Sequence, residues 1–198
     1  MIIKGTALAL QKLVEGNQRY LAGQLTHPHQ TAQRRLELLH HQTPFAIILG
    51  CADSRVPPEV IFDQGLGDLF VVRVAGNILD EAVLGSLEYA VAHLKTQLLV
   101  VLGHRACGAV KATLEAMLAD ETGEGHLDFL INALKPAILQ ARQQDGDLLD
   151  QAIRVNIERT VNQLKEMEPI IAPQVEAQNL KIIGAYYDLE SGRVEFWG

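Results

Sequence analysis

Residues 47–55 read Ile-Ile-Leu-Gly-Cys-Ala-Asp-Ser-Arg, and residues 100–108 read Val-Val-Leu-Gly-His-Arg-Ala-Cys-Gly. Each stretch places a glycine and then a side chain that can bind a metal directly after a short apolar run. An apolar run without polar alternation is typical of a strand buried on both faces, as in a parallel sheet. A third such run covers residues 69–72. We therefore expect all three runs to be strands of one parallel sheet.

Helical patterns fill the intervals between these runs. Apolar residues recur at helical spacing over 82–95, and helices are also expected over 108–118, 127–143 and 148–168. Two further apolar segments, 180–187 and 194–197, flank a turn that contains glycine and predict an antiparallel strand pair. The expected fold class is α/β, with a small, mainly parallel sheet of about four parallel strands plus an antiparallel edge strand, flanked by helices.

The first 43 residues differ from the rest of the chain. An amphipathic pattern over 6–25 predicts a helix, and the polar segment 26–43 predicts a short helix over 34–40. We find no interdomain linker and no internal repeat. The prediction is therefore one domain over 1–198, with an N-terminal helical arm (1–43) and an α/β core (44–198).

Composition narrows the class of protein. The chain has 17 Lys and Arg against 24 Asp and Glu, a net charge of −7, which disfavours nucleic acid and anionic membranes as partners. No stretch reaches the roughly 18 uncharged apolar residues that span a bilayer. The opening residues lack the pattern of a secretion signal, and two cysteines make no disulfide framework. We expect a cytoplasmic protein.

Both cysteines take part in a predicted metal site. In open parallel sheets, the loops after the carboxyl ends of the strands form the ligand crevice. Cys51, His104 and Cys107 would then supply sulfur, nitrogen and sulfur to one tetrahedral zinc ion. The fourth position would be left to solvent or to Asp53. The pair His104 and Cys107 alone is a weak signal, since a buried thiol beside a satisfied imidazole would explain it.

Asp53 and Arg55 follow the first cysteine at a spacing of two residues, which allows a bidentate ion pair. Such a pair is elsewhere often only structural. Beside a metal, a carboxylate held by an arginine can accept a proton from a nucleophile on zinc, or it can rotate and bind the metal itself.

Together, Cys51-Ala52-Asp53-Ser54-Arg55 and His104-Arg105-Ala106-Cys107-Gly108 resemble the paired motif of the β-class carbonic anhydrases. The resemblance covers most of the chain. It implies one zinc ion per chain, reversible hydration of carbon dioxide to bicarbonate and a proton through a hydroxide on zinc, and assembly as a homodimer or a higher homo-oligomer.

The resemblance also assigns roles to individual residues. Cys51, His104 and Cys107 match the zinc ligands, with Asp53 as a fourth ligand only in a closed state, and Asp53 with Arg55 matches the catalytic dyad. Gln42, nine residues before Cys51, matches a glutamine that orients the substrate, and Tyr89, fifteen residues before His104, matches a pocket tyrosine. Phe70 matches a pocket wall near the dimer interface, and Gly108 is also assigned to substrate binding.

Some bacterial members resemble a switchable type. There, a non-catalytic bicarbonate binds a tryptophan, an arginine and a tyrosine, and it favours a closed site with the aspartate on zinc. Arg73 and Tyr187 match two of these positions, but Ile48 stands at the tryptophan position. We therefore predict that Asp53 pairs with Arg55 and that bicarbonate acts only as ordinary product. A second departure is the stretch 73–77, Arg-Val-Ala-Gly-Asn, which differs from that of plant-like members.

Two other functions remain open from the sequence. The same scaffold could hydrolyse carbonyl sulfide or carbon disulfide, since a hydroxide on zinc attacks those linear electrophiles as well. A non-catalytic zinc-binding module would result if Asp53 permanently filled the fourth position.

Overall fold

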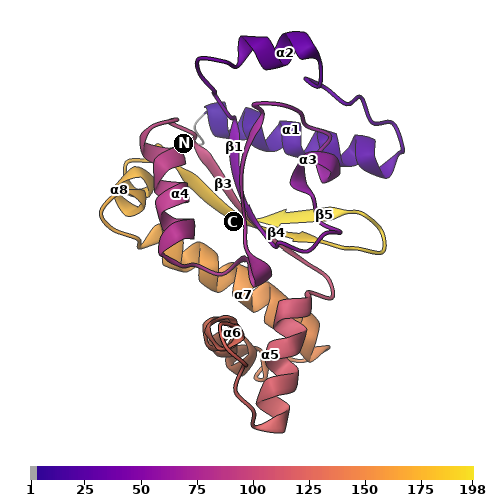
Figure 1. The fold of residues 1–198 in the computed structure, drawn as a ribbon, viewed down its shortest axis with the longest axis vertical. Coiled ribbons are helices and arrows are strands. Elements are labelled where there is room, and N and C mark those ends of the chain that lie inside the picture. Colours follow the sequence, from indigo (N-terminus) through magenta and orange to yellow (C-terminus); the bar gives the residue numbers. More distant parts are fainter. Residues whose placement is uncertain (1–3) are drawn as a thin grey trace.

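The computed structural model of the protein describes residues 4–198. One five-stranded sheet organises the chain, with the strand order β2-β1-β3-β4-β5 (Figure 1). The first four strands in this order are parallel, and the edge strand β5 is antiparallel to β4. The strands are β1 (Ala46–Gly50), β2 (Leu69–Arg73), β3 (Leu98–His104), β4 (Lys181–Tyr187) and β5 (Val194–Trp197). The predicted fold class is confirmed.

Helices cover both faces of the sheet, and a 3-10 turn, η1 (Ala75–Asn77), follows β2. The helices are α1 (Lys4–Leu21), α2 (Ala32–Glu37), α3 (Pro58–Ile61), α4 (Glu81–Ala92), α5 (Gly108–Ala119), α6 (Leu127–Ala141), α7 (Leu148–Lys165) and α8 (Ile171–Glu176). No helix within residues 4–198 is long and apolar enough to cross a bilayer.

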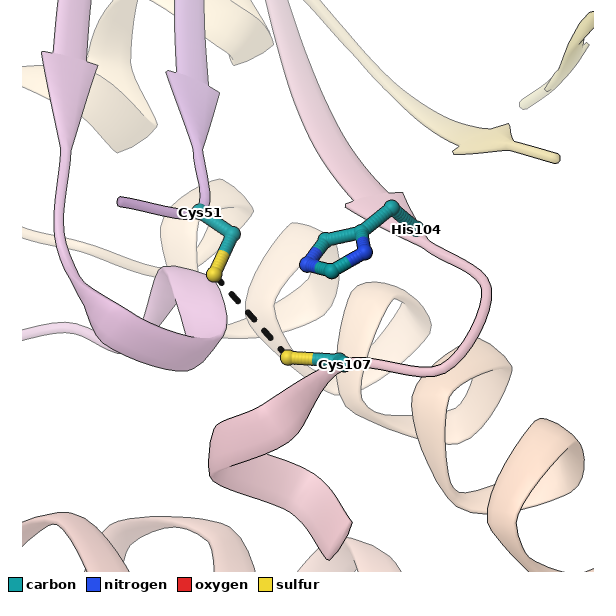
Figure 2. Close-up of side chains that lie close together, drawn as sticks. All are labelled: Cys51, His104 and Cys107. Carbon is teal, nitrogen blue, oxygen red and sulfur yellow. Dashed lines mark hydrogen bonds between the residues drawn. The ribbon is translucent and has the colours of Figure 1, made fainter. Parts of the chain in front are cut away.

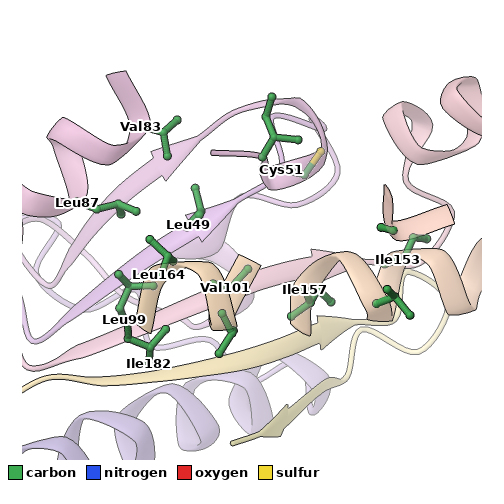
Figure 3. Close-up of a cluster of buried hydrophobic side chains, with 14 of the residues drawn as sticks. Leu49, Cys51, Val83, Leu87, Leu99, Val101, Ile153, Ile157, Leu164 and Ile182 are labelled. Atoms are coloured by element: carbon green, nitrogen blue, oxygen red, sulfur yellow. The ribbon is translucent and has the colours of Figure 1, made fainter. Parts of the chain in front are cut away.

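The central strands are apolar throughout because both of their faces are covered. All residues of β1 and β3 are buried. Successive side chains of a strand point to opposite faces, so Ile47 and Leu49 pack in one core cluster and Ile48 packs in another. The first cluster lies under α4, α6 and α7. Figure 3 shows its residues from α4, α7 and the strands. The second lies under α1 and α3.

The N-terminal helix belongs to the second core cluster. Leu13 is fully buried and Ala9 is nearly so, and both pack against the sheet. Asn17 also binds the turn between β4 and β5, where its side chain donates to the carbonyl of Gly192 at 3.0 Å and accepts from the Val194 amide at 3.0 Å. The division into an arm and a core stays a prediction, but α1 is an integral part of the packing.

Several element ends differ from the sequence expectation. Helix α1 ends at Leu21 instead of residue 25, and Gly23 follows in a left-handed turn with φ +64°. Helix α2 covers 32–37 instead of 34–40, because the Thr31 side chain caps it by accepting the Arg34 amide at 3.1 Å. The short helices α3 and α8 were not predicted, since four and six residues are too few to show helical periodicity.

Candidate metal centre

Two neighbouring parallel strands deliver the candidate ligands to one edge of the sheet. In the register of β1 and β3, Gly50 lies beside Leu102. Cys51 therefore leaves β1 next to the end of β3, where His104 is the last strand residue. Cys107 follows after a turn in which Ala106 has a left-handed conformation, with φ +53°. Parallel pairing thus brings together residues that are more than fifty positions apart in the chain.

Cys51, His104 and Cys107 are buried and face one another (Figure 2). Their ligating atoms all lie within 4.8 Å of each other, and the two sulfur atoms are 3.9 Å apart. Within residues 4–198, this is the one group of histidine, cysteine and acidic side chains that could hold a metal ion. The spacing suits a tetrahedral zinc site with sulfur and nitrogen ligands.

The protonation of His104 also fits a metal. Its Nδ1 lies 2.9 Å from the carbonyl oxygen of Arg105. Because a carbonyl can only accept, Nδ1 carries the hydrogen, and Nε2 presents its lone pair to the two sulfurs. Nε2 is buried and makes no hydrogen bond within the described chain. A buried acceptor without a partner is costly unless a cation satisfies it.

The electrostatics of the two sulfurs favour a cation as well. A hydrogen bond from the Cys107 thiol lowers the pKa of Cys51 to about 4. The same bond, together with burial, raises the pKa of Cys107. The pair therefore keeps one proton between its sulfurs, and a divalent cation in that place would favour both thiolates. Two further features support negative charge: the Gly76 amide donates to the Cys51 sulfur at 3.3 Å, and Cys107 occupies the N-cap position of α5.

Asp53 and Arg55 lie at the mouth of this cluster. Arg55 donates hydrogen bonds to both carboxylate oxygens and thereby lowers the pKa of Asp53. The Oδ2 atom of Asp53 is 3.9 Å from Nε2 of His104. The carboxylate is thus ionised, oriented by an arginine and close to the candidate metal position.

In the switchable type, the arginine that matches Arg73 binds a bicarbonate. In this structure, Arg73 instead binds the main chain near the cluster. Its Nε donates to the carbonyl of Cys51 at 2.8 Å, and a terminal nitrogen donates to the carbonyl of Asp53 at 2.5 Å. The guanidinium therefore fixes the main chain that carries both Cys51 and Asp53. An arginine at the end of an apolar strand indicates that its side chain binds a polar partner there. The sequence does not reveal that the partners are main-chain carbonyls.

The other predicted site residues do not all meet within one chain. Gly108 is the first residue of α5 and follows Cys107 directly, so it adjoins the cluster. Phe70 pairs with Ile47 in the register of β2 and β1, about 13 Å along the strand from Cys51. The Tyr89 ring stands 6.2 Å from the Phe70 ring and is 46% exposed. Gln42 is exposed and precedes β1, at the opposite end of the strand from Cys51.

A cavity of about 820 Å³ flanks the turn at residues 105–106, but the three candidate ligands do not line it. Its charged walls are largely paired with each other. Arg105 binds Asp188 and Glu190, and Arg154 binds Asp150 and Glu195. The chemistry therefore lies in the Cys-His-Cys cluster rather than in this larger space.

Comparison with known proteins agrees with this geometry. The family described as carbonic anhydrase matches residues 46–194. A carbonic anhydrase of Mycolicibacterium smegmatis is 46% identical over 187 residues, which cover 94% of this chain and 91% of that protein. Carbonic anhydrase 2 of Mycobacterium tuberculosis is 43% identical over 185 residues, covering 93% of this chain and 89% of that protein.

Solved structures show the same arrangement of the chain. One of two tetrameric β-carbonic anhydrases from Sordaria macrospora superimposes with a TM-score of 0.73 at 30% identity, covering 97% of this chain and 95% of that chain. The β-carbonic anhydrase of Coccomyxa, in complex with acetazolamide, superimposes with a TM-score of 0.72 at 28% identity, covering 94% of this chain and 85% of that chain.

Proposed function

Because the chain belongs to the β-carbonic anhydrase family, we infer that it is a zinc enzyme that reversibly hydrates carbon dioxide to bicarbonate and a proton. The observation that carries this conclusion is the buried cluster of Cys51, His104 and Cys107, with the Nε2 lone pair of His104 directed at two sulfurs. These three side chains would hold the zinc ion. When bound, zinc acts as a Lewis acid that makes a water molecule nucleophilic near neutral pH.

The residues of the chain orient the reaction around that ion. Asp53 is ionised, so its Oδ2 can accept a hydrogen bond from the attacking water and direct the oxygen lone pair toward carbon dioxide. Arg55 fixes both carboxylate oxygens, and Arg73 fixes the main chain beneath them. The catalytic groups are thus preorganised before the substrate arrives, which avoids reorganisation during the reaction.

We further propose that a second copy of the chain completes the substrate pocket. In one chain, Gln42 precedes β1, Phe70 lies near the start of β2 and Tyr89 of α4 packs beside Phe70, whereas Cys51 follows the other end of β1. Phe70 belongs to β2 and Tyr89 packs beside it, so both lie at the sheet edge formed by β2, whose apolar residues are only partly buried. A partner seated over this edge would cover Phe70 and Tyr89 and bring them to the partner's site. The tetrameric relatives from Sordaria macrospora support a homo-oligomer.

We also propose a cytoplasmic location. The proposal is supported by the two free cysteines, because free thiols are typical of a reducing compartment.

Stopped-flow measurement of carbon dioxide hydration, with zinc analysis of the same sample, tests the proposed function. We expect fast hydration and one zinc ion per chain, and no comparable release of sulfide from carbonyl sulfide or carbon disulfide. The matching relatives are carbonic anhydrases, so these sulfur substrates are not favoured. A fully zinc-loaded protein without hydration activity would instead indicate the non-catalytic zinc-binding module.

Light scattering tests the proposed assembly. We expect a dimer or larger species for the wild type, and dissociation for Tyr89→Glu, which would place a charge in the proposed contact. A monomeric, active wild type would contradict the shared pocket.

A further inference from the structure

Helix α7 contacts the turn beside the candidate metal centre through one buried polar side chain. Asn156 is 6% exposed, and its Nδ2 donates to the carbonyl oxygen of Gly76 at 2.9 Å. The two residues are eighty positions apart in the chain. This hydrogen bond holds the two segments together. If it broke, the buried amide of Asn156 would be left without that hydrogen-bond partner, which is energetically costly.

Close packing fixes the position of α7 at this point. A Cβ atom at Gly103 would lie 2.5 Å from Cδ1 of Ile157, so any larger residue there would force the Ile157 side chain away from β3. Ile153 and Ile157 lie on this face of α7, over the sheet (Figure 3). Gly103 directly precedes His104. The helix that carries Asn156 is therefore in contact with the strand that delivers a zinc ligand.

The turn that Asn156 holds is also the turn that contacts the first cysteine. Gly76 has a left-handed conformation, with φ +68°, and its amide donates to the sulfur of Cys51 at 3.3 Å. Cβ contacts at Gly76 would be 3.0 Å to Leu134 and 3.3 Å to Ala109, so the turn is tightly enclosed. The carbonyl and the amide of one residue thus connect Asn156 with the zinc thiolate.

We propose that Asn156 is a positioning residue of the zinc centre, which holds Gly76 so that its amide donates to the Cys51 sulfur. A hydrogen bond to a thiolate withdraws electron density from the sulfur and so moderates its donation to the metal. Asn156 would thereby set the donor strength of one ligand without touching the metal. This inference rests on the proposed zinc site of Cys51, His104 and Cys107.

The test uses metal spectroscopy on the full chain. In wild-type protein loaded with cadmium-113, we expect a scalar coupling between the metal and the Gly76 amide proton across the sulfur. With cobalt, Asn156→Leu should move the thiolate charge-transfer band to longer wavelength, since the sulfur loses a hydrogen bond. Zinc affinity, measured by competition with a chromogenic chelator, should fall about tenfold, because the released Gly76 turn no longer holds the Cys51 sulfur in position, and this loss outweighs the stronger donation of the sulfur. Thr160→Val, a change at a buried polar residue of the same helix, should leave both readouts unchanged.

The outcomes separate this inference from the proposed function. A wild-type chain that binds none of the three metals would overturn the zinc site itself. A wild type that binds metal but shows no coupling to Gly76 would overturn only the role of Asn156, as would Asn156→Leu with an unshifted band and unchanged affinity. If Asn156→Leu does not fold, Asn156→Ala provides the same test, because the smaller side chain fits the space and also lacks the donor.

Discussion

Arg55 donates two hydrogen bonds to Asp53, from Nε to Oδ1 at 2.9 Å and from a terminal nitrogen to Oδ2 at 2.7 Å. The main-chain amide of Arg55 adds a third bond to Oδ1 at 2.9 Å. Oδ2 accepts only one of these three bonds, and it lies 3.9 Å from Nε2 of His104. Two residues of one loop therefore produce an ionised carboxylate with a single orientation beside the candidate zinc ligands.

Asp53→Asn should keep zinc and lose most of the hydration activity, by about 100-fold or more. An amide cannot accept a proton as the carboxylate does, and it no longer pairs with Arg55 as an anion. Arg55→Ala should behave similarly, because the carboxylate would lose its orientation. Stopped-flow assays with zinc analysis check both variants, with the exposed Asp145→Asn as control. Wild-type turnover in either dyad variant would show that the assigned role is wrong.

Cys107→Ala should abolish tight zinc binding and activity together. It removes one of three protein ligands, and the loss should exceed the roughly 10-fold to 100-fold cost of changing an outer-shell partner. Cys51→Ala and His104→Ala should give the same result. Elemental analysis of each purified, dialysed variant is the measurement. A full complement of zinc in Cys107→Ala would rule out the proposed ligand set.

The sheet and the metal ligands could be predicted because they depend on short, local patterns. The apolar runs of β1 and β3 are buried on both faces and therefore show no polar alternation, and the run of β2 is equally apolar although it lies at the sheet edge and is only partly buried. Cys51 and His104 come directly at the ends of two such runs, and parallel neighbours end at the same edge of a sheet. These two facts suffice to place the ligands together.

The supporting contacts could not be predicted, because they depend on distances between segments remote in sequence. Arg73 binds the carbonyls of Cys51 and Asp53, and Asn156 binds the carbonyl of Gly76. Every residue has a main-chain carbonyl, so the sequence does not show which carbonyl accepts a hydrogen bond from a given side chain. Gln42, Phe70 and Tyr89 have a different limit, since the contacts proposed for them belong to a second chain.

Asp63 should make the fold sensitive to acid. It joins α1 to the following loop: Arg19 Nε lies 2.6 Å from Oδ2, and the amides of Thr26 and His27 also donate to this carboxylate. Burial opposes the charge, but these donors outweigh it and lower the pKa of Asp63. Since the folded pKa is below the unfolded value of about 3.9, the contribution to stability is present above that pH and is lost as the pH falls through the folded pKa.

Asp63→Asn should therefore lower the free energy of unfolding by about 2–3 kcal/mol at pH 7, as expected for hydrogen bonds to a buried charged group. The difference from the wild type should shrink below about pH 4, where the carboxyl of the unfolded chain binds a proton while that of the folded chain is still ionised. Urea unfolding at a series of pH values measures this difference, with Asp145→Asn as control. A destabilisation that does not change with pH would contradict the electrostatic explanation.

Bicarbonate should inhibit this enzyme only as an ordinary product, because the donors of the switchable type are absent or already bonded. Ile48 is fully buried in the second core cluster and offers no indole N–H. Arg73 binds the carbonyls of Cys51 and Asp53, and the Tyr187 hydroxyl is 3.2 Å from that of Tyr20. A bicarbonate bound there would lack one donor and would have to displace others, at a cost of about 1–3 kcal/mol for each group left unsatisfied.

Initial rates of hydration against bicarbonate concentration near pH 7 measure this directly, and we expect hyperbolic inhibition without cooperativity. Arg73→Met should not change the form of the curve, since Arg73 holds the main chain and not an anion, but it should lower turnover by loosening Asp53. A matched measurement is a crystal structure of the zinc-loaded protein near pH 7, in which Asp53 should remain on Arg55. Steeply cooperative inhibition, or an Asp53 carboxylate about 2 Å from zinc, would instead place this chain among the switchable enzymes.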